Sequence, residues 1–261
     1  MGNKVPLVSL IHPLFEMNYQ VLFKTDSKVS VVMEQALRLF HECGLPLSDV
    51  DFINSGGPAM HALLLKAQPR MTQFTGSSRV AEMLCKDLHG KIKIEDAGFD
   101  WKVLGPDVHE FDYVAWTSDQ DAYALSGQKC SAQSILFMHE NWAKAGLLNK
   151  LESLAARRNL DDFTSGPILT VTNATYDSHV QALLAIPGSK MLFGGKLEKH
   201  RIPVEYGSFK PTAVQVFFQR INRHALVVLY VGSFGGVSKA GKLQDLYQRN
   251  LRTFPGHRGI Q

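Results

Sequence analysis

The stretch RMTQFTGSSRVAEMLCKDLHGKIKIED, residues 70–96, decides the fold because it passes from strand to helix and back to strand. Residues 70–76 predict a strand, the serines at 77 and 78 begin a helix, and residues 91–96 predict a second strand. Strands that alternate with helices at this spacing are typical of a parallel sheet with helices on its faces. We therefore expect an α/β fold.

The residues upstream repeat this alternation. Strands are expected over residues 20–24 and 49–55, followed by helices over residues 27–44 and 57–67. Turns rich in Gly and Ser, NSGGP and FTGSS, end two of the predicted strands. In such folds ligands bind beyond the carboxyl ends of the strands, and phosphates bind at helix N-termini. Four apolar residues are expected to share one face of the first helix: Val32, Ala36, Leu39 and Phe40.

The residues downstream predict a second α/β unit, with a boundary near Glu95–Gly98. An amphipathic segment over residues 109–127 precedes a strand over residues 131–140 and one long helix over residues 142–158. The amphipathic segment contains two acids two positions apart, Asp119 and Asp121. We interpret them as part of a solvated face and not as a metal site.

The chain divides into two α/β regions and a tail of different composition, residues 1–95, 96–216 and 217–261. The tail carries seven Lys and Arg against one Asp, whereas the preceding residues carry 21 basic and 23 acidic side chains. The tail is therefore the one region that suggests a nucleic acid or an anionic surface as partner. Because such basic segments are usually solvated, we expect no nucleic-acid partner.

The composition excludes several classes of protein. With 261 residues and 45% hydrophobic content the chain can bury a sizeable core. The cysteines, Cys43, Cys85 and Cys130, are odd in number and far apart, and no Cys/His spacing is that of a zinc site. We expect no disulfide framework, no metal and a reducing compartment. No apolar run approaches the ~20 residues that cross a bilayer, and we expect neither a signal peptide nor a transit peptide.

Three motifs follow one another along the chain: FTGSS at 74–78, KIEDAG at 93–98 and SGQKCSA at 126–132. In this order and spacing they resemble the aldehyde dehydrogenase superfamily. The segments DSKVSVVMEQ and EDAGFDWKVLGPDV are similar in sequence to segments of the plant-type delta-1-pyrroline-5-carboxylate dehydrogenases, which oxidise glutamate semialdehyde. The resemblance runs from about Val21 to Val216. It implies a partial Rossmann-type nucleotide-binding sheet followed by a partial α/β catalytic domain.

The resemblance also implies a reaction. Cys130 matches the family's nucleophile, whose thiolate attacks the aldehyde to give a thiohemiacetal and, after hydride transfer, a thioester. Glu95 matches the general base that activates the thiol or the hydrolytic water. Ser131 matches a serine that touches the substrate carboxylate in glutamate-semialdehyde enzymes with a Cys-Ser-Ala sequence.

Hydride transfer needs a nicotinamide dinucleotide, and four positions match positions that bind it in the family. Gly76 and Ser77 match the turn that holds the pyrophosphate at a helix N-terminus. Lys24 matches the lysine that binds the adenosine ribose, and Gly57 belongs to a Gly-Pro pair close to the adenine. The family's ribose-binding Glu is replaced by Ser27. We expect NAD as the cofactor, with NADP as the alternative.

The sequence also departs from the family pattern. Family members are about twice as long, and the segment with the Asn that stabilises the oxyanion is missing. Residues 5–19 are interpreted as an insertion, and the match stops near Val216, before the Glu-x-Phe-Gly-Pro motif and the dimerisation strand. We expect a chain truncated at both ends.

Three functions remain open. The first is oxidation of a small aldehyde, glutamate semialdehyde, to glutamate in proline catabolism. The second is a catalytically inactive chain that at most associates with full-length subunits. The third, ranked last, is nucleic-acid binding by residues 217–261. The resemblance implies a homo-oligomeric family and the mitochondrial matrix, with the cytoplasm as the alternative because no presequence is evident. We expect no membrane partner.

Overall fold

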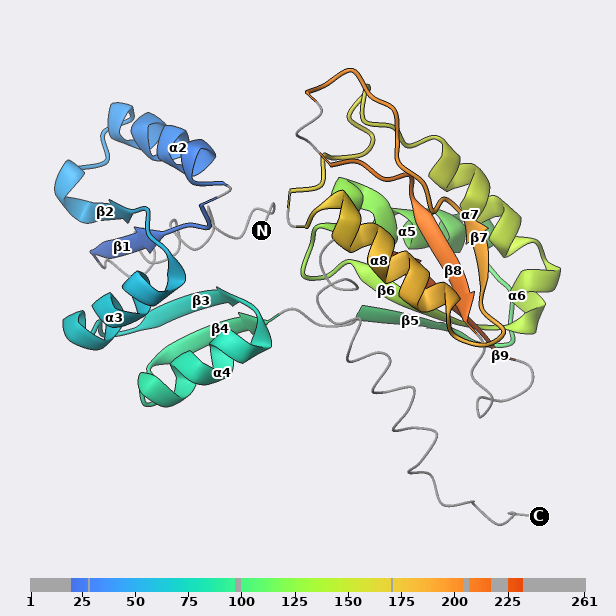
Figure 1. Ribbon diagram of the computed structural model, residues 1–261, viewed down its shortest axis with the longest axis horizontal. Coiled ribbons are helices and arrows are strands. Elements are labelled where there is room, and N and C mark those ends of the chain that lie inside the picture. The colour runs from blue at the N-terminus through green and yellow to red at the C-terminus, as the bar shows by residue number, and fades with distance from the viewer. Residues whose placement is uncertain are drawn as a thin grey trace, which may run out of the picture. The chain divides into compact units, whose positions relative to one another are not determined.

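The computed structural model describes residues 20–27, 29–96, 100–169, 171–203, 207–216 and 225–231. They form two compact units, which divide between Ala97 and Gly98 (Figure 1). Each unit combines strands with helices and is described by itself.

Strands and helices alternate along the first unit. Its elements are β1 (Val21–Lys24), α2 (Ser30–Glu42), η2 (Leu47–Asp49), β2 (Val50–Ile53), α3 (Gly57–Ala67), β3 (Thr72–Gly76), α4 (Ser78–Asp87) and β4 (Ile92–Asp96). The strands pair in parallel as predicted, β1 with β2 and β3 with β4. They form two two-stranded sheets and not one continuous sheet, because β1 and β3 each bond to one neighbour among the described residues.

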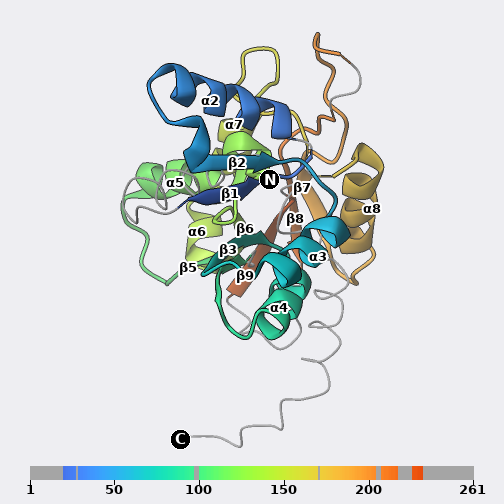
Figure 2. The same cartoon turned by 90° about the vertical axis from the view of Figure 1, so that its left-hand side faces the viewer.

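Each sheet of the first unit is covered by a helix: α2 lies against the β1–β2 pair and α4 against the β3–β4 pair (Figure 2). The α2 contact is built from four buried side chains: Phe23, Met33, Leu37 and Val50. Two residues of the predicted apolar face, Val32 and Leu39, are instead 68% and 61% exposed. Met33 and Leu37 lie on one face of the helix because they are four residues apart. This face packs against the sheet.

The second unit is a five-stranded sheet with helices on both faces. Its elements are β5 (Asp100–Leu104), α5 (Phe111–Tyr123), η3 (Ala124–Gly127), β6 (Gln133–His139), α6 (Glu140–Lys144), α7 (Leu147–Ala156), α8 (Asn173–Leu184), β7 (Lys190–Phe193), β8 (Thr212–Val216) and β9 (Ala225–Val231). The strand order is β5-β6-β9-β8-β7. The β5–β6 pair is parallel and the other pairs are antiparallel.

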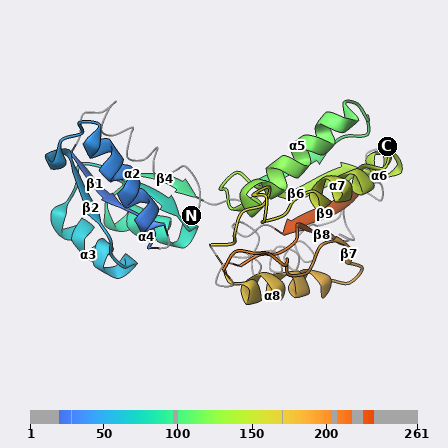
Figure 3. The same ribbon diagram turned by 90° about the horizontal axis from the view of Figure 1, so that it is seen from above.

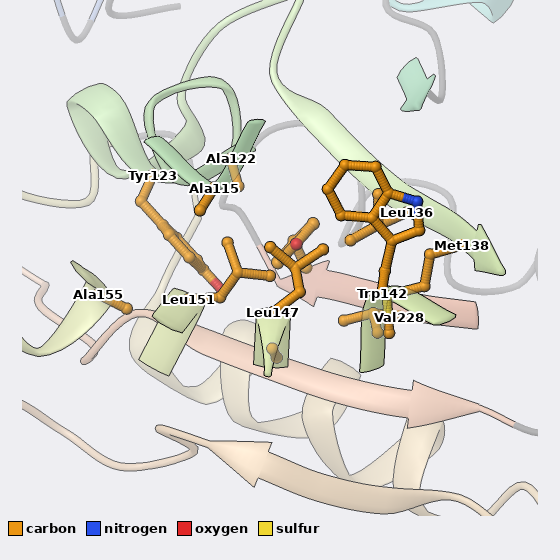
Figure 4. Close-up of a cluster of buried hydrophobic side chains, with 12 residues drawn as sticks. Ala115, Ala122, Tyr123, Leu136, Met138, Trp142, Leu147, Leu151, Ala155 and Val228 are labelled. Carbon is orange, nitrogen blue, oxygen red and sulfur yellow. The ribbon is translucent and has the colours of Figure 1, made fainter. Parts of the chain in front are cut away.

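The two faces of this sheet bury separate apolar clusters. Helices α5 and α7 cover one face and α8 covers the other (Figure 3). The first cluster contains Tyr123, Leu136, Trp142, Leu147 and Leu151 (Figure 4). The second contains Tyr176, Val180, Val214, Val227 and Leu229. Both clusters include residues of β9, so this strand completes the core.

The place of β9 corrects the predicted tail, which was to begin at residue 217. Residues 225–231, ALVVLYV, lie between β6 and β8, and four of them are almost fully buried: Val227, Val228, Leu229 and Tyr230. A continuous apolar run is what a strand covered on both faces requires. The basic residues that defined the tail lie outside the described residues.

A second correction concerns the long helix predicted over residues 142–158. The structure has two helices there, α6 and α7, which are separated at Gly146. Gly146 has a φ of 92°, a left-handed conformation that glycine adopts without the steric cost of a side chain. The chain therefore turns between the two helices.

Candidate functional site

A groove in the first unit brings together three of the four positions that the sequence predicted to bind a dinucleotide. Lys24, Gly57 and Gly76 line it, together with residues of β1 and β3 and the first turns of α3 and α4. Its volume is about 1160 Å³. Ser77 is not among the lining residues; it follows Gly76 as the N-cap residue of α4.

Two helices begin at this groove with little side chain in the way. A Cβ added to Gly57 would meet no atom within 4 Å, so the missing side chain leaves space for a ligand. A Cβ added to Gly76 would collide with the ring of Phe74. The first N–H groups of a helix lack intrahelical acceptors and carry partial positive charge. The starts of α3 and α4 therefore suit an anionic group such as a phosphate.

The lining of the groove is also basic and contains an unsatisfied hydroxyl. Four cations stand against one acid, Asp26: Lys24, Arg70, Arg79 and Lys93. Thr25 is 3% exposed, and its hydroxyl has no hydrogen-bond partner among the described residues. A buried hydroxyl without a partner is costly, so a ligand that hydrogen-bonds to it would be stabilised. These features fit a dinucleotide, which offers both phosphates and hydroxyls.

Glu95, the predicted general base, lies near the end of β4 in the same unit. In the parallel register it is the partner of Thr75, the residue directly before Gly76. Its side chain is exposed. The structure thus places Glu95 on the strand next to the predicted pyrophosphate turn, with its side chain exposed, but not among the residues that line the groove.

Cys130, the predicted nucleophile, lies in the second unit on the connection between η3 and β6. A hydrogen bond of 3.3 Å from the Ala132 amide to the Lys129 carbonyl closes a turn, with Cys130 and Ser131 at its corner. Cys130 is half-buried and Ser131 is exposed. The other two cysteines of the chain are exposed, and all three are free thiols.

A cation precedes Cys130 in the chain. The Lys129 ammonium donates a hydrogen bond of 3.2 Å to the Gln120 carbonyl. Burial lowers the pKa of Lys129 below its ordinary value, while the negative charges of Asp121 and of the Cys130 thiolate act in the opposite direction. The positive charge of this ammonium thus lies close enough to Cys130 for the two groups to interact.

Two side chains that hold this turn were not predicted as site residues. Gln128 is 5% exposed; its Nε2 donates to the Pro167 carbonyl at 2.7 Å and its Oε1 accepts from the Leu169 amide at 2.8 Å. The Ser126 hydroxyl donates to the Gly166 carbonyl at 2.6 Å. These partners lie 39 to 41 positions away, so no local sequence pattern reveals them.

The predicted solvated face of α5 is correct for one acid and wrong for the other. Asp121 is about half exposed and pairs with Lys102 at 2.9 Å. Asp119 is fully buried and pairs with Arg158 at 2.6 Å. Because residues two apart on a helix point to different sides, one carboxylate reaches solvent while the other faces the interior.

The described parts of the chain lack two further kinds of feature. No group of three or more His, Cys, Asp or Glu is arranged there to hold a metal ion. None of the helices described above combines the length and the apolar character that crossing a membrane requires.

Comparison with known proteins then establishes the family. The model of the aldehyde dehydrogenase family matches residues 5–220. The chain belongs to the aldehyde dehydrogenase family. A Linum usitatissimum protein named probable aldehyde dehydrogenase is 62% identical over 219 residues, which are 84% of this chain and 40% of that protein. Delta-1-pyrroline-5-carboxylate dehydrogenase 12A1, mitochondrial, of Arabidopsis thaliana is 62% identical over 84% of this chain and 39% of its own length.

Solved structures agree with this family. A mutant 1-pyrroline-5-carboxylate dehydrogenase of Thermus thermophilus has a TM-score of 0.64 at 24% identity, covering 74% of this chain and 39% of its own. A 1-pyrroline-5-carboxylate dehydrogenase from Thermus with bound NAD has a TM-score of 0.63 at the same identity and coverage. The predicted family and its fold are therefore confirmed. The chain spans less than half the length of these relatives.

Proposed function

We propose that this chain oxidises glutamate semialdehyde to glutamate with NAD, through a thioester on Cys130. The observation that carries the proposal is that Cys130 is half-buried on a hydrogen-bonded turn, whereas the thiols of Cys43 and Cys85 are exposed. The 62% identity to an Arabidopsis protein named delta-1-pyrroline-5-carboxylate dehydrogenase supports this substrate. The word mitochondrial in that name supports the mitochondrial matrix as the location, and the substrate in the name supports proline catabolism as the pathway.

The first half of the reaction takes place on Cys130. Its thiolate forms a bond to the aldehyde carbon, and the carbonyl oxygen receives the electron pair as an oxyanion. Loss of a hydride from that carbon gives a thioester. A nicotinamide dinucleotide held by Lys24, Gly57, Gly76 and Ser77 would supply the hydride acceptor. The exposed Ser131 hydroxyl, next to the nucleophile, binds the distal carboxylate of the substrate.

The second half regenerates the thiol. Glu95 accepts a proton from a water molecule, and the hydroxide adds to the thioester carbon. The carbon–sulfur bond then breaks, the Cys130 thiolate leaves, and the carboxylic acid is released. Water can reach Glu95 because its side chain is exposed.

Four residues are proposed to hold the dinucleotide. The backbone at Gly76 and Ser77, with the start of α4, binds the pyrophosphate, because that N-terminus presents unpaired N–H groups. The Lys24 ammonium binds the adenosine ribose, and Gly57 leaves room for the adenine at the start of α3. We propose NAD and not NADP as the cofactor. Parallel assays with the two dinucleotides test this preference.

One observation favours a second function, that of an inactive chain which associates with longer subunits of the same family. Among the described residues β1 and β3 are each paired on one side only, and an open strand edge is a template for pairing with another chain.

The deciding experiment is aldehyde-dependent reduction of NAD by the purified chain. The proposal predicts turnover that Cys130→Ala abolishes and that Cys85→Ala, the same change at an exposed thiol, leaves intact. Lys24→Ala is expected to raise the KM for NAD. A folded chain without turnover refutes the proposal, and co-elution with a full-length relative would then support the second function.

A further inference from the structure

The turn that carries Cys130 begins in an unfavourable backbone conformation. Leu125, Ser126 and Gly127 have φ values of 56°, 55° and 68°, so three consecutive residues are left-handed. Only the glycine adopts this conformation without steric cost. Backbone of this kind persists only where surrounding contacts determine it, and it occurs preferentially at functional sites.

Hydrogen bonds to one distant segment, residues 166–169, supply those contacts. The Gln128 amide donates to the Pro167 carbonyl at 2.7 Å and accepts from the Leu169 amide at 2.8 Å. Its Nε2 also donates back to the Leu125 carbonyl at 3.2 Å, which bridges the left-handed run. Ser126 adds a reciprocal pair with Gly166, at 2.6 and 3.0 Å.

The distant segment is itself fixed in the fold. The Ile168 amide donates to the Gly207 carbonyl at 2.7 Å, and the Ile168 side chain is 5% exposed within the apolar cluster under α8. The buried Gln128 amide therefore connects the nucleophile turn to a segment that is itself hydrogen-bonded and packed into the core of the unit. Three short bonds that all use one amide leave the turn few alternative positions.

We propose that Gln128 is a positioning residue, which holds the Cys130 turn in its reactive place by clamping it to residues 166–169. Gln128 does not touch the substrate; it acts through the turn. This inference rests on the proposed function, since it assigns Gln128 to the same thiol. A thiol that shifts by about 1 Å can lose on the order of 100-fold in rate, so the clamp is expected to matter for chemistry more than for folding.

The test compares Gln128→Met with Gln133→Met in the full chain. Methionine keeps the length of the side chain and removes the amide. Gln133 is equally buried at 5% and lies three positions after Cys130, but its amide lies against the Tyr230 hydroxyl and not against residues 166–169. The readouts are the rate of Cys130 alkylation by iodoacetamide relative to Cys85, its pH profile, and the kcat and KM for the aldehyde.

The clamp predicts that Gln128→Met lowers the Cys130-to-Cys85 alkylation ratio and kcat by about tenfold or more, whereas Gln133→Met changes neither. Gln128→Glu keeps the acceptor oxygen and loses both N–H donors, so it should lower the alkylation ratio and kcat as Gln128→Met does. If Gln128→Met retains the wild-type ratio and pH profile, the inference is overturned while the proposed function stands. If the wild-type Cys130 is itself unreactive, the proposed function fails first. If Gln128→Met does not fold, Ser126→Ala, which removes the hydrogen bonds to Gly166, takes its place and is compared with Gln133→Met by the same readouts.

Discussion

The buried ion pair between α5 and the end of α7 gives a prediction whose size follows from the structure. Arg158 donates to both carboxylate oxygens of Asp119, with distances from 2.6 to 3.3 Å, and to the Thr164 carbonyl at 3.0 Å. The two ionic side chains are 7% and 0% exposed, so solvent does not screen them. Arg158→Met leaves the carboxylate buried without its main partner, a change that typically costs about 3–5 kcal/mol.

One neighbour moderates that cost. The Arg157 guanidinium lies 3.7 Å from the Asp119 carboxylate, but its side chain is 55% exposed and compensates only in part. We therefore expect Arg158→Met to lower the free energy of unfolding by about 3 kcal/mol, toward the lower end of that range. The double variant Asp119→Leu/Arg158→Met should recover more than half of the loss, because no charge is left buried alone.

Urea unfolding followed by tryptophan fluorescence reports on the second unit, which contains this ion pair. The three tryptophans of the chain, Trp101, Trp116 and Trp142, all belong to the second unit. A matched control is Lys150→Met, which removes a pair with Asp112 in which the two side chains are 41% and 80% exposed. That change should cost less than about 1 kcal/mol. A loss for Arg158→Met no larger than this control would refute the buried geometry of the pair.

Three further predictions concern the stability of the second unit. Burial lowers the pKa of His179 to about 4, so as the pH falls from about 6.5 the unfolded chain binds a proton before the folded chain does. The free energy of unfolding should therefore be highest above pH 6.5 and fall by roughly 3 kcal/mol between pH 6.5 and 4. Urea titrations at each pH should show that His179→Leu removes this pH-dependent loss. Tyr123→Phe removes a buried hydrogen bond of 2.9 Å to the Thr212 carbonyl and should cost about 1–3 kcal/mol in the same assay; no loss would contradict that bond. Gly146→Ala forces a side chain into the left-handed region and should lower stability by about 1–2 kcal/mol, whereas a stabilised variant would place the helix break elsewhere.

Local patterns in the sequence predicted the strands and helices well where each element stands alone. The alternation over residues 20–96 gave four strands and three helices close to their observed bounds, since apolar period and glycine-rich turns act locally. The same patterns could not decide how strands pair at a distance. The separation of β1 from β3 is therefore a finding of the structure.

The errors share a physical cause, which is burial decided by tertiary contacts. Asp119 was placed in solvent because its partner, Arg158, lies 39 positions later. Residues 225–231 were placed in a tail because their basic neighbours dominate the local composition, although the run itself is apolar enough for a central strand. Similarly, SGQKCSA marked the position of Cys130, but the clamp made by Gln128 depends on residues 166–169, which that motif does not contain.

The most direct measurement is the rate at which iodoacetamide alkylates each of the three cysteines at near-neutral pH, resolved by peptide mass spectrometry. Exposure alone would make the half-buried Cys130 the slowest, because Cys43 and Cys85 are exposed. Alkylation follows the thiolate fraction, so a nucleophile activated by its surroundings reacts ahead of more accessible thiols. We predict that Cys130 is alkylated first, by about tenfold in rate. Alkylation of Cys130 no faster than that of Cys43 and Cys85 would contradict its role as the nucleophile.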